Sequence, residues 1–280
     1  MNMALPADFT LEFFGNCEAI NILRKAGVPE PQLMAVQGGE RIPLFSRETR
    51  EQAEAGEIDL RPGPPGGPPI PHPSHAVLSV DVWPSLHCLI PEGHLPDVFD
   101  TATRYTGAAH SYVCTFDVNY GMKHGLLKLD KLIPEEKRSA GISSFIEYVD
   151  NREKWQFSDH DGGQLMYNIH VAEKKTILWN AHLGGYEGIL RDLDPKPQMV
   201  ILGIAGRANH DGRPFEGSGA EFASRQVEWL GRPDQLIWCL HDESVVPPYR
   251  VDTRAAREAV ESMGTKVIDM EPNKLKHLTI

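Results

Sequence analysis

Two patterns of apolar and polar residues run through the second half of this chain. Alternation over Gln164–Val171 and Thr176–Trp179, with residues 172–175 as the turn, predicts a β-hairpin. Beyond residue 186 the pattern switches repeatedly between helix-like and strand-like segments. We expect helices at Tyr186–Asp192, Ala220–Leu230 and Thr253–Ser262, and strands at Gln198–Ile204, Gln235–Leu240 and Lys266–Met270. Strand–helix alternation of this kind is typical of a layered α/β sheet.

The first half of the chain is less regular. A helical pattern over Cys17–Ala26 ends at Gly27, and a later segment, Ala76–Trp83, alternates as a strand does. Gly38 and Gly39 can supply the positive φ of a tight turn. They separate two short strand-like pieces, Gln32–Val36 and Arg41–Phe45, and Pro134–Ser139 predicts the start of a helix.

The segment Glu48–His75 differs from its surroundings in composition. It begins with charged residues and continues as RPGPPGGPPIPHPSH. Proline removes backbone donors and glycine adds chain entropy, so we interpret residues 48–75 as an exposed surface insertion. Strand-like pieces continue on both sides of it. We therefore expect residues 1–280 to form a single domain.

Composition narrows the classes of partner. The 28 Lys and Arg residues against 39 Asp and Glu residues give a net charge of -11, which disfavours binding to nucleic-acid backbones. The sequence has no apolar run long enough for a membrane span, and its first 14 residues do not resemble a signal peptide. We expect a cytoplasmic protein that binds a small-molecule substrate or ligand. The four cysteines are widely separated, which predicts reduced, buried thiols; composition leaves the oligomeric state open.

Three histidines directly follow predicted strands. His87 lies in VWPSLHCL, His182 in ILWNAHLGGYEG and His241 in LIWCLHDES. Functional groups of α/β sheets gather at the carboxyl ends of strands, and three imidazoles plus a water could form a catalytic zinc site. The alternative is that these are ordinary histidines among the 12 in the chain. Position at a strand end favours His87 and His241 more than His182.

A glycine-rich loop over residues 203–222 leads into a predicted helix near Ser218. The helix N-terminus could hold an anion, or Ser218 could simply cap the helix. The chain has no H-E-x-x-H, G-x-S-x-G, Walker or G-x-G-x-x-G motif.

Taken together, four blocks resemble one branch of the metallo-β-lactamase superfamily. The most specific part is GRANHDGRPFEGS, residues 206–218. The blocks are Ala26–Leu44, Val82–His87, Gly184–Ser218 and His241–Glu243. The resemblance implies an αββα sandwich that binds one or two zinc ions. It also implies a metal-bound hydroxide that hydrolyses esters, amides or phosphoesters.

The resemblance also assigns ligands. It places His87 at the middle histidine of the family and the last ligand at or beside His241. The family aspartate falls within Asn180–Leu183, where His182 is the good ligand. The family motif H-x-H-x-D-H is missing, and with it the general base. We therefore expect the opening strands of the sandwich to be reduced or missing as well. Asp242, next to His241, is the predicted catalytic carboxylate.

Two hypotheses follow from these residues. The first is a metal-dependent hydrolase of unknown substrate with a degenerate zinc site that holds at most one ion, weakly. The second is a non-catalytic scaffold of the same fold that binds a ligand or a protein partner. We expect little or no turnover from the chain as written, since a hydroxide nucleophile needs both the ion and a positioned carboxylate.

Overall fold

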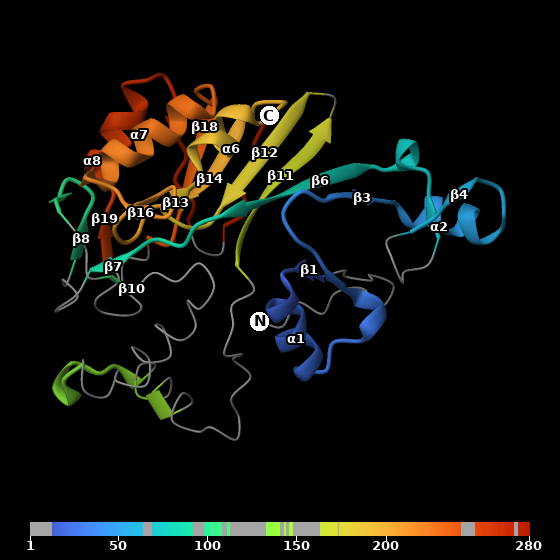
Figure 1. Cartoon of the computed structure of the whole chain (residues 1–280), viewed down its shortest axis with the longest axis horizontal. Helices are drawn as coiled ribbons and strands as arrows, with labels where there is room; N and C mark the ends of the chain where they lie inside the picture. Colours follow the sequence, from blue (N-terminus) through green and yellow to red (C-terminus); the bar gives the residue numbers. More distant parts are fainter. Residues whose placement is uncertain are drawn as a thin grey trace.

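A seven-stranded mixed sheet forms the centre of the molecule in the computed structural model (Figure 1). The structure describes residues 13–63, 69–91, 98–107, 111–112, 133–140, 143, 146–147, 163–172, 174–241, 250–271 and 274–280. The strand order is β20-β18-β14-β12-β11-β6-β3. In that order the strands span Lys266–Val267, Gln235–Cys239, Met199–Gly203, Lys175–Asn180, Gln164–Ala172, Leu78–Ser85 and Arg41–Leu44. The α/β class predicted from the sequence is thereby confirmed. The specific αββα sandwich stays a prediction.

The direction of the strands brings several chain segments to one sheet edge. Strands β12, β14, β18 and β20 are mutually parallel, while β11 is antiparallel to both β12 and β6. Strand β6 therefore points the same way as β12. The loops after β6, β12, β14 and β18 all begin at this edge, which is where α/β sheets bind ligands.

Helices pack on one face of this sheet. Helices α6 (Glu187–Asp192), α7 (Gly219–Trp229) and α8 (Arg254–Glu261) lie along it in Figure 1. Alternate strand residues such as Met166, Leu178 and Trp238 point to this face and join the largest buried apolar cluster. Phe222 of α7 is fully buried in the same cluster. Apolar residues that recur every two positions in the strands and about every 3.6 positions in the helices thus form one shared core.

The opposite face is covered by the two ends of the described chain. Phe14 of strand β1 (Phe13–Gly15) packs near Val82 and Tyr167, in a small apolar cluster at the β6–β11 side. Leu278 and Ile280 pack on a second cluster that includes Met199. In the described ranges, all strands outside the central sheet belong to sheets of two or three strands.

The remaining elements are short. Helix α1 (Cys17–Lys25) begins at Asn16, whose side chain accepts a hydrogen bond from the Ala19 amide, and is followed by Gly27 at φ +87°. The other strands are β2 (Leu33–Ala35), β4 (Leu60–Arg61), β5 (Ile70–Pro71), β7 (Ile90–Pro91), β8 (Val98–Asp100), β9 (Arg104–Tyr105), β10 (Ser111–Tyr112), β13 (Gly184–Gly185), β15 (Asn209–His210), β16 (Arg213–Pro214), β17 (Gly217–Ser218) and β19 (Arg250–Asp252). In the described part of the chain, three 3₁₀ helices span Glu30–Gln32, Pro73–His75 and Glu135–Lys137. Among the described residues, no helix has both the length and the apolar character needed to cross a bilayer.

The segment expected to be an irregular insertion contains regular structure. Helix α2 (Arg47–Glu54) begins at Ser46, whose hydroxyl accepts a hydrogen bond from the Thr49 amide, and β4 pairs with β5. The helix has no buried residue, which is why apolar periodicity gave no sign of it. Its residues are exposed or half-buried, and Pro71 is the buried residue in the described part of 48–75.

The expectation of buried thiols was wrong for one cysteine. Cys88 is buried and Cys239 half-buried, but Cys17 at the start of α1 is exposed. Cys114 lies outside the described residues. None of the three described cysteines forms a disulfide.

Candidate metal centre

Two loops converge at the sheet edge where β6 and β12 end. His87 lies two residues beyond β6 and His182 two residues beyond β12. Strand β11 separates β6 from β12 in the sheet, so the loop after β12 must cross toward β6. Gly184 permits this crossing, because a Cβ at that position would lie 2.5 Å from the Leu86 carbonyl oxygen.

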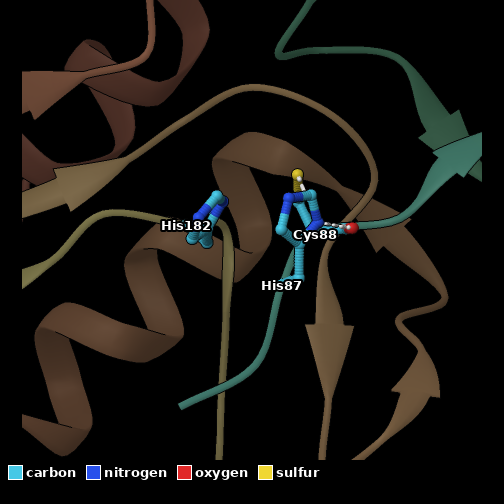
Figure 2. A group of neighbouring side chains, drawn as sticks. All are labelled: His87, Cys88 and His182. Atoms are coloured by element: carbon cyan, nitrogen blue, oxygen red, sulfur yellow. Dashed lines mark hydrogen bonds between the residues drawn. The ribbon is translucent and has the colours of Figure 1, made fainter. Parts of the chain in front are cut away.

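The convergence places two imidazoles and a thiol together. The ring centroids of His87 and His182 lie 4.1 Å apart with an interplanar angle of 35°. Cys88 Sγ lies 3.7 Å from His87 Nδ1, and the three side chains offer ligand atoms within 4.8 Å of one another. Figure 2 shows the two rings side by side, with the sulfur of Cys88 close to the His87 ring. This cluster could hold a metal ion.

The hydrogen bond of His87 indicates its tautomer. Its Nδ1 lies 2.6 Å from the main-chain oxygen of Cys88. A carbonyl oxygen can only accept, so Nδ1 carries the proton, and Nε2 rather than the Nδ1 near Cys88 Sγ is the nitrogen of the neutral ring that could bind a metal ion. A ring nitrogen bonded to a main-chain carbonyl is the common way in which proteins orient a metal-binding histidine.

His182 is held as a neutral ring. Burial lowers the pKa of His182 to about 3, with a further contribution from repulsion by the nearby His87. Its Nδ1 is buried and has no hydrogen-bond partner in the protein. Buried polar atoms are rarely unpaired, so such an atom calls for a specific explanation. An unpaired nitrogen beside a second imidazole and a thiol is the arrangement that a cation would complete.

Cys88 is the residue that sequence reasoning missed. Its side chain was interpreted as a structural thiol, although it directly follows His87. Burial raises the pKa of the Cys88 thiol to about 12, opposed by hydrogen bonds from the backbone of Cys88 and Leu183. The thiol is therefore protonated at neutral pH, and a metal ion would have to displace that proton. The adjacency of histidine and cysteine was the available signal in the sequence.

A buried polar network fixes both loops. The Ser85 hydroxyl donates to Asn180 Oδ1 at 2.7 Å, and Asn180 Nδ2 donates to the Gly184 carbonyl at 2.8 Å. Asn209, in strand β15, donates to the His87 carbonyl at 2.9 Å. The side-chain amide of Asn180 therefore bonds both Ser85 and Gly184. Hydrogen bonds through Asn180 thus tie the end of β6 to the loop after β12, and Asn209 separately holds the main chain of His87.

The predicted third histidine does not join the cluster. His241 is half-buried two residues beyond β18, and it belongs to neither group of neighbouring ligand-type side chains among the described residues. Asp242, the predicted catalytic carboxylate, lies outside the described residues.

The helix after the glycine-rich loop is capped by its own residues. The Ser218 hydroxyl accepts from the Glu221 amide at 3.1 Å, and Glu221 Oε2 accepts from the Ser218 amide at 2.7 Å. This reciprocal pair is a capping box, so the capping interpretation of Ser218 is confirmed. These two amides are not available to an anion.

Comparison of the chain with protein-family models and with curated proteins found no match. The functional interpretation therefore rests on the geometry of the cluster itself.

Proposed function

We propose that this protein is a zinc-dependent hydrolase of the metallo-β-lactamase superfamily with an incomplete metal centre built on His87, Cys88 and His182. The observation that carries the proposal is the buried Nδ1 of His182, which has no hydrogen-bond partner and lies beside a second imidazole and a thiol. Position supports it as well, because both loops begin at the edge where α/β sheets bind ligands.

The donor set suits zinc. Two neutral imidazoles and one thiolate are borderline to soft ligands, and three protein ligands leave a fourth position for water or substrate. Zinc in such a site lowers the pKa of a bound water and polarises the oxygen of a carbonyl or phosphoryl group. The protein's own part would be to orient the rings through the Cys88 carbonyl and the Asn180 and Asn209 amides.

A second candidate function is a metal-binding scaffold without turnover. It is favoured by the composition of the cluster, which contains no carboxylate among the described residues that could act as general base. Asp242 is the carboxylate proposed for that role. A hydrolase needs it, whereas a scaffold does not.

Cobalt titration tests the metal centre directly. Co²⁺ bound to a thiolate gives a near-ultraviolet charge-transfer band. We expect this band in the wild type at one ion per chain, and its loss in Cys88→Ser. His182→Gln should weaken binding by at least about tenfold, because even partners outside the ligand shell contribute that much. His75→Gln, in an exposed 3₁₀ helix, is the matched control. Absence of the band in the wild type would refute the centre.

Hydrolysis assays then separate the two functions. Nitrophenyl esters and a bis-nitrophenyl phosphodiester would be assayed with zinc, with chelator and with Asp242→Asn. Turnover that is lost with chelator and reduced in Asp242→Asn supports the hydrolase. Stoichiometric metal binding without any turnover supports the scaffold, and turnover that survives chelation refutes a metal mechanism.

A further inference from the structure

A second group of ligand-type side chains lies at the start of helix α6. His210 Nε2 donates a hydrogen bond to Glu187 Oε2 at 3.1 Å and lies 3.4 Å from Asp211 Oδ2, so a cation bound at Nε2 would displace that proton. All three ligand atoms lie within 4.8 Å of one another. None of these residues belongs to the proposed zinc centre.

Main-chain pairing fixes these residues in place. Strand β13 pairs with β15, so that Gly185 lies opposite His210, and the Asp211 amide donates to the Gly185 carbonyl at 3.2 Å. The Glu187 amide donates to Asp211 Oδ1 at 2.9 Å. The turn is set by Asp211 at φ +51° and Gly212 at φ +80°. Glu187 and Asp211, 24 residues apart, are thus brought together before any cation is considered.

Aromatic side chains also pack against the imidazole of His210. Its ring stacks on Trp229 of α7, with centroids 5.2 Å apart and an interplanar angle of 27°. Phe215 and Phe222 lie around the same ring at 6.4 and 6.1 Å. This aromatic packing directs Nε2 toward the two carboxylates. The ligand side chains are half-buried or exposed, so the group is open to solvent.

We propose that Glu187, His210 and Asp211 form a second divalent-cation site, independent of the first. Ligand atoms around one ion lie about 3–3.5 Å apart, given metal–ligand bonds of ~2.0–2.2 Å. The two separations from His210 Nε2, 3.1 and 3.4 Å, match that spacing. One imidazole and two carboxylates are harder ligands than the imidazole–thiol cluster, so this site suits Mn²⁺, whereas the thiol of the first centre selects softer ions such as Zn²⁺. The cation would tie the first turn of α6 to the β15–β16 turn.

Arg191 is the competing positive charge. Its Nε lies 2.7 Å from Glu187 Oε1, and this oxygen is the one that does not face His210. The carboxylate therefore has Oε2 available for a cation while Oε1 stays paired. Two carboxylates and one guanidinium leave the group with one net negative charge, which attracts a divalent ion. Removal of Arg191 should accordingly strengthen binding.

Manganese titration followed by electron paramagnetic resonance tests this site. The probe is Mn²⁺ alone, added to the wild type and to the Cys88→Ser/His182→Gln variant that lacks the first centre. We expect one bound Mn²⁺ per chain in both. Because the first centre is absent from the variant, failure of the proposed function would not affect this result. Bound Mn²⁺ should also raise the melting temperature, since it binds the folded state.

Single substitutions decide which groups hold the ion. His210→Gln and Asp211→Asn should each weaken Mn²⁺ binding at least about tenfold, and Arg191→Gln should tighten it. Glu216→Gln, an exposed carboxylate in the same loop, should leave the affinity unchanged. Circular dichroism and urea unfolding establish that each variant is folded before titration. The proposal is overturned if the wild type binds no Mn²⁺, or if Asp211→Asn and Glu216→Gln behave alike.

Discussion

The imidazole rings of His87 and His182 lie with their centroids 4.1 Å apart, although they follow strands that are not neighbours in the sheet. The contact exists because the loop after β12 crosses the start of β11 and rests on Leu86 through Gly184. It has an energetic consequence. His182 gives up solvation at Nδ1 without gaining a hydrogen bond, which is unfavourable in the absence of a ligand.

The first prediction is that His182→Leu stabilises the metal-free protein. Leucine fills a similar volume and leaves no unpaired polar atom. Since an unpaired buried polar group costs ~1–3 kcal/mol, we expect a gain of about 1 kcal/mol in the free energy of unfolding. Urea unfolding in the presence of chelator measures it. The same variant should lose the rise in melting temperature that zinc gives the wild type. Marked destabilisation of the metal-free variant would indicate that the ring fills an ordinary structural role.

The second prediction concerns the pH dependence of metal binding through Cys88. Because burial raises the pKa of this thiol to about 12, the thiol is protonated throughout the neutral range. An ion that binds sulfur must release one proton, so its affinity should rise about tenfold per pH unit over roughly pH 6.5–8. The pKa of His182, at about 3, is too low for this ring to contribute in that window.

Calorimetric titration with zinc in buffers of different ionisation enthalpy measures this proton release. Cys88→Ser is the matched variant, and its affinity should vary less steeply with pH than that of the wild type. Equal slopes in the two proteins would remove Cys88 from the ligand set.

The sequence predicted the helix-covered part of the fold well. Alternation over Gln164–Val171 and Thr176–Trp179 corresponds to β11 and β12, and the segments that became α7 and α8 were predicted within a few residues. These elements each bury a face in one core, so burial leaves a clear period in the sequence. Helix α2 has no buried residue, so its sequence shows no such apolar period. The segment Pro134–Ser139, predicted to start a helix, holds a 3₁₀ helix, and residue 140 directly after it is helical, with the Ser143 amide donating to the Ser139 carbonyl at 2.9 Å.

The candidate site was predictable in part. Position after a predicted strand identified His87 and His182 as candidate ligands, although the same criterion favoured His241 over His182. The structure brings His182, and not His241, to His87. Strand order, which no local pattern contains, decides which strand ends meet. The crossing loop at Gly184 brings His182 to His87, whereas His241 follows a strand two places further along the sheet. Cys88 was missed because a lone cysteine is usually a buried thiol.

The third prediction concerns the ion-paired carboxylate in the middle of β6. Burial raises the pKa of Asp81, but hydrogen bonds from Arg41 and His170 outweigh this and hold the pKa below its usual range. His170 Nε2 lies 2.7 Å from Asp81 Oδ2, and Arg41 donates to the same oxygen at 2.8 Å. Asp81→Asn should therefore lower the free energy of unfolding by about 2 kcal/mol at pH 7, since hydrogen bonds to charged groups are worth ~1.5–3 kcal/mol.

The sign of the pH effect follows from the lowered pKa of Asp81. Its stabilisation is fully present above the unfolded-state value of about 3.9 and is lost as the pH falls through the folded-state pKa. The difference between wild type and Asp81→Asn should thus shrink below about pH 4. Asp59→Asn, at an exposed aspartate, is the control and should change stability little at any pH. A difference for Asp81→Asn that is as large in acid as at neutral pH would contradict the assignment.

The fourth prediction separates a glycine that positions the site from one that does not. A Cβ at Gly203 would lie 2.3 Å from the Ala181 carbonyl oxygen and 2.7 Å from His182 Cα, and both obstacles are backbone. Gly203→Ala must therefore displace the loop that carries His182. Overpacking of this kind lowers stability by ~1–3 kcal/mol, and zinc binding should be lost together with the convergence of the two rings.

At Gly188, inside α6, an added Cβ meets nothing within 4 Å. Gly188→Ala should raise stability by about 0.4–1 kcal/mol and leave zinc binding unchanged. Thermal unfolding and zinc titration of both variants measure these effects. If Gly203→Ala binds zinc as the wild type does, the path of that loop is not what holds His182 in the centre.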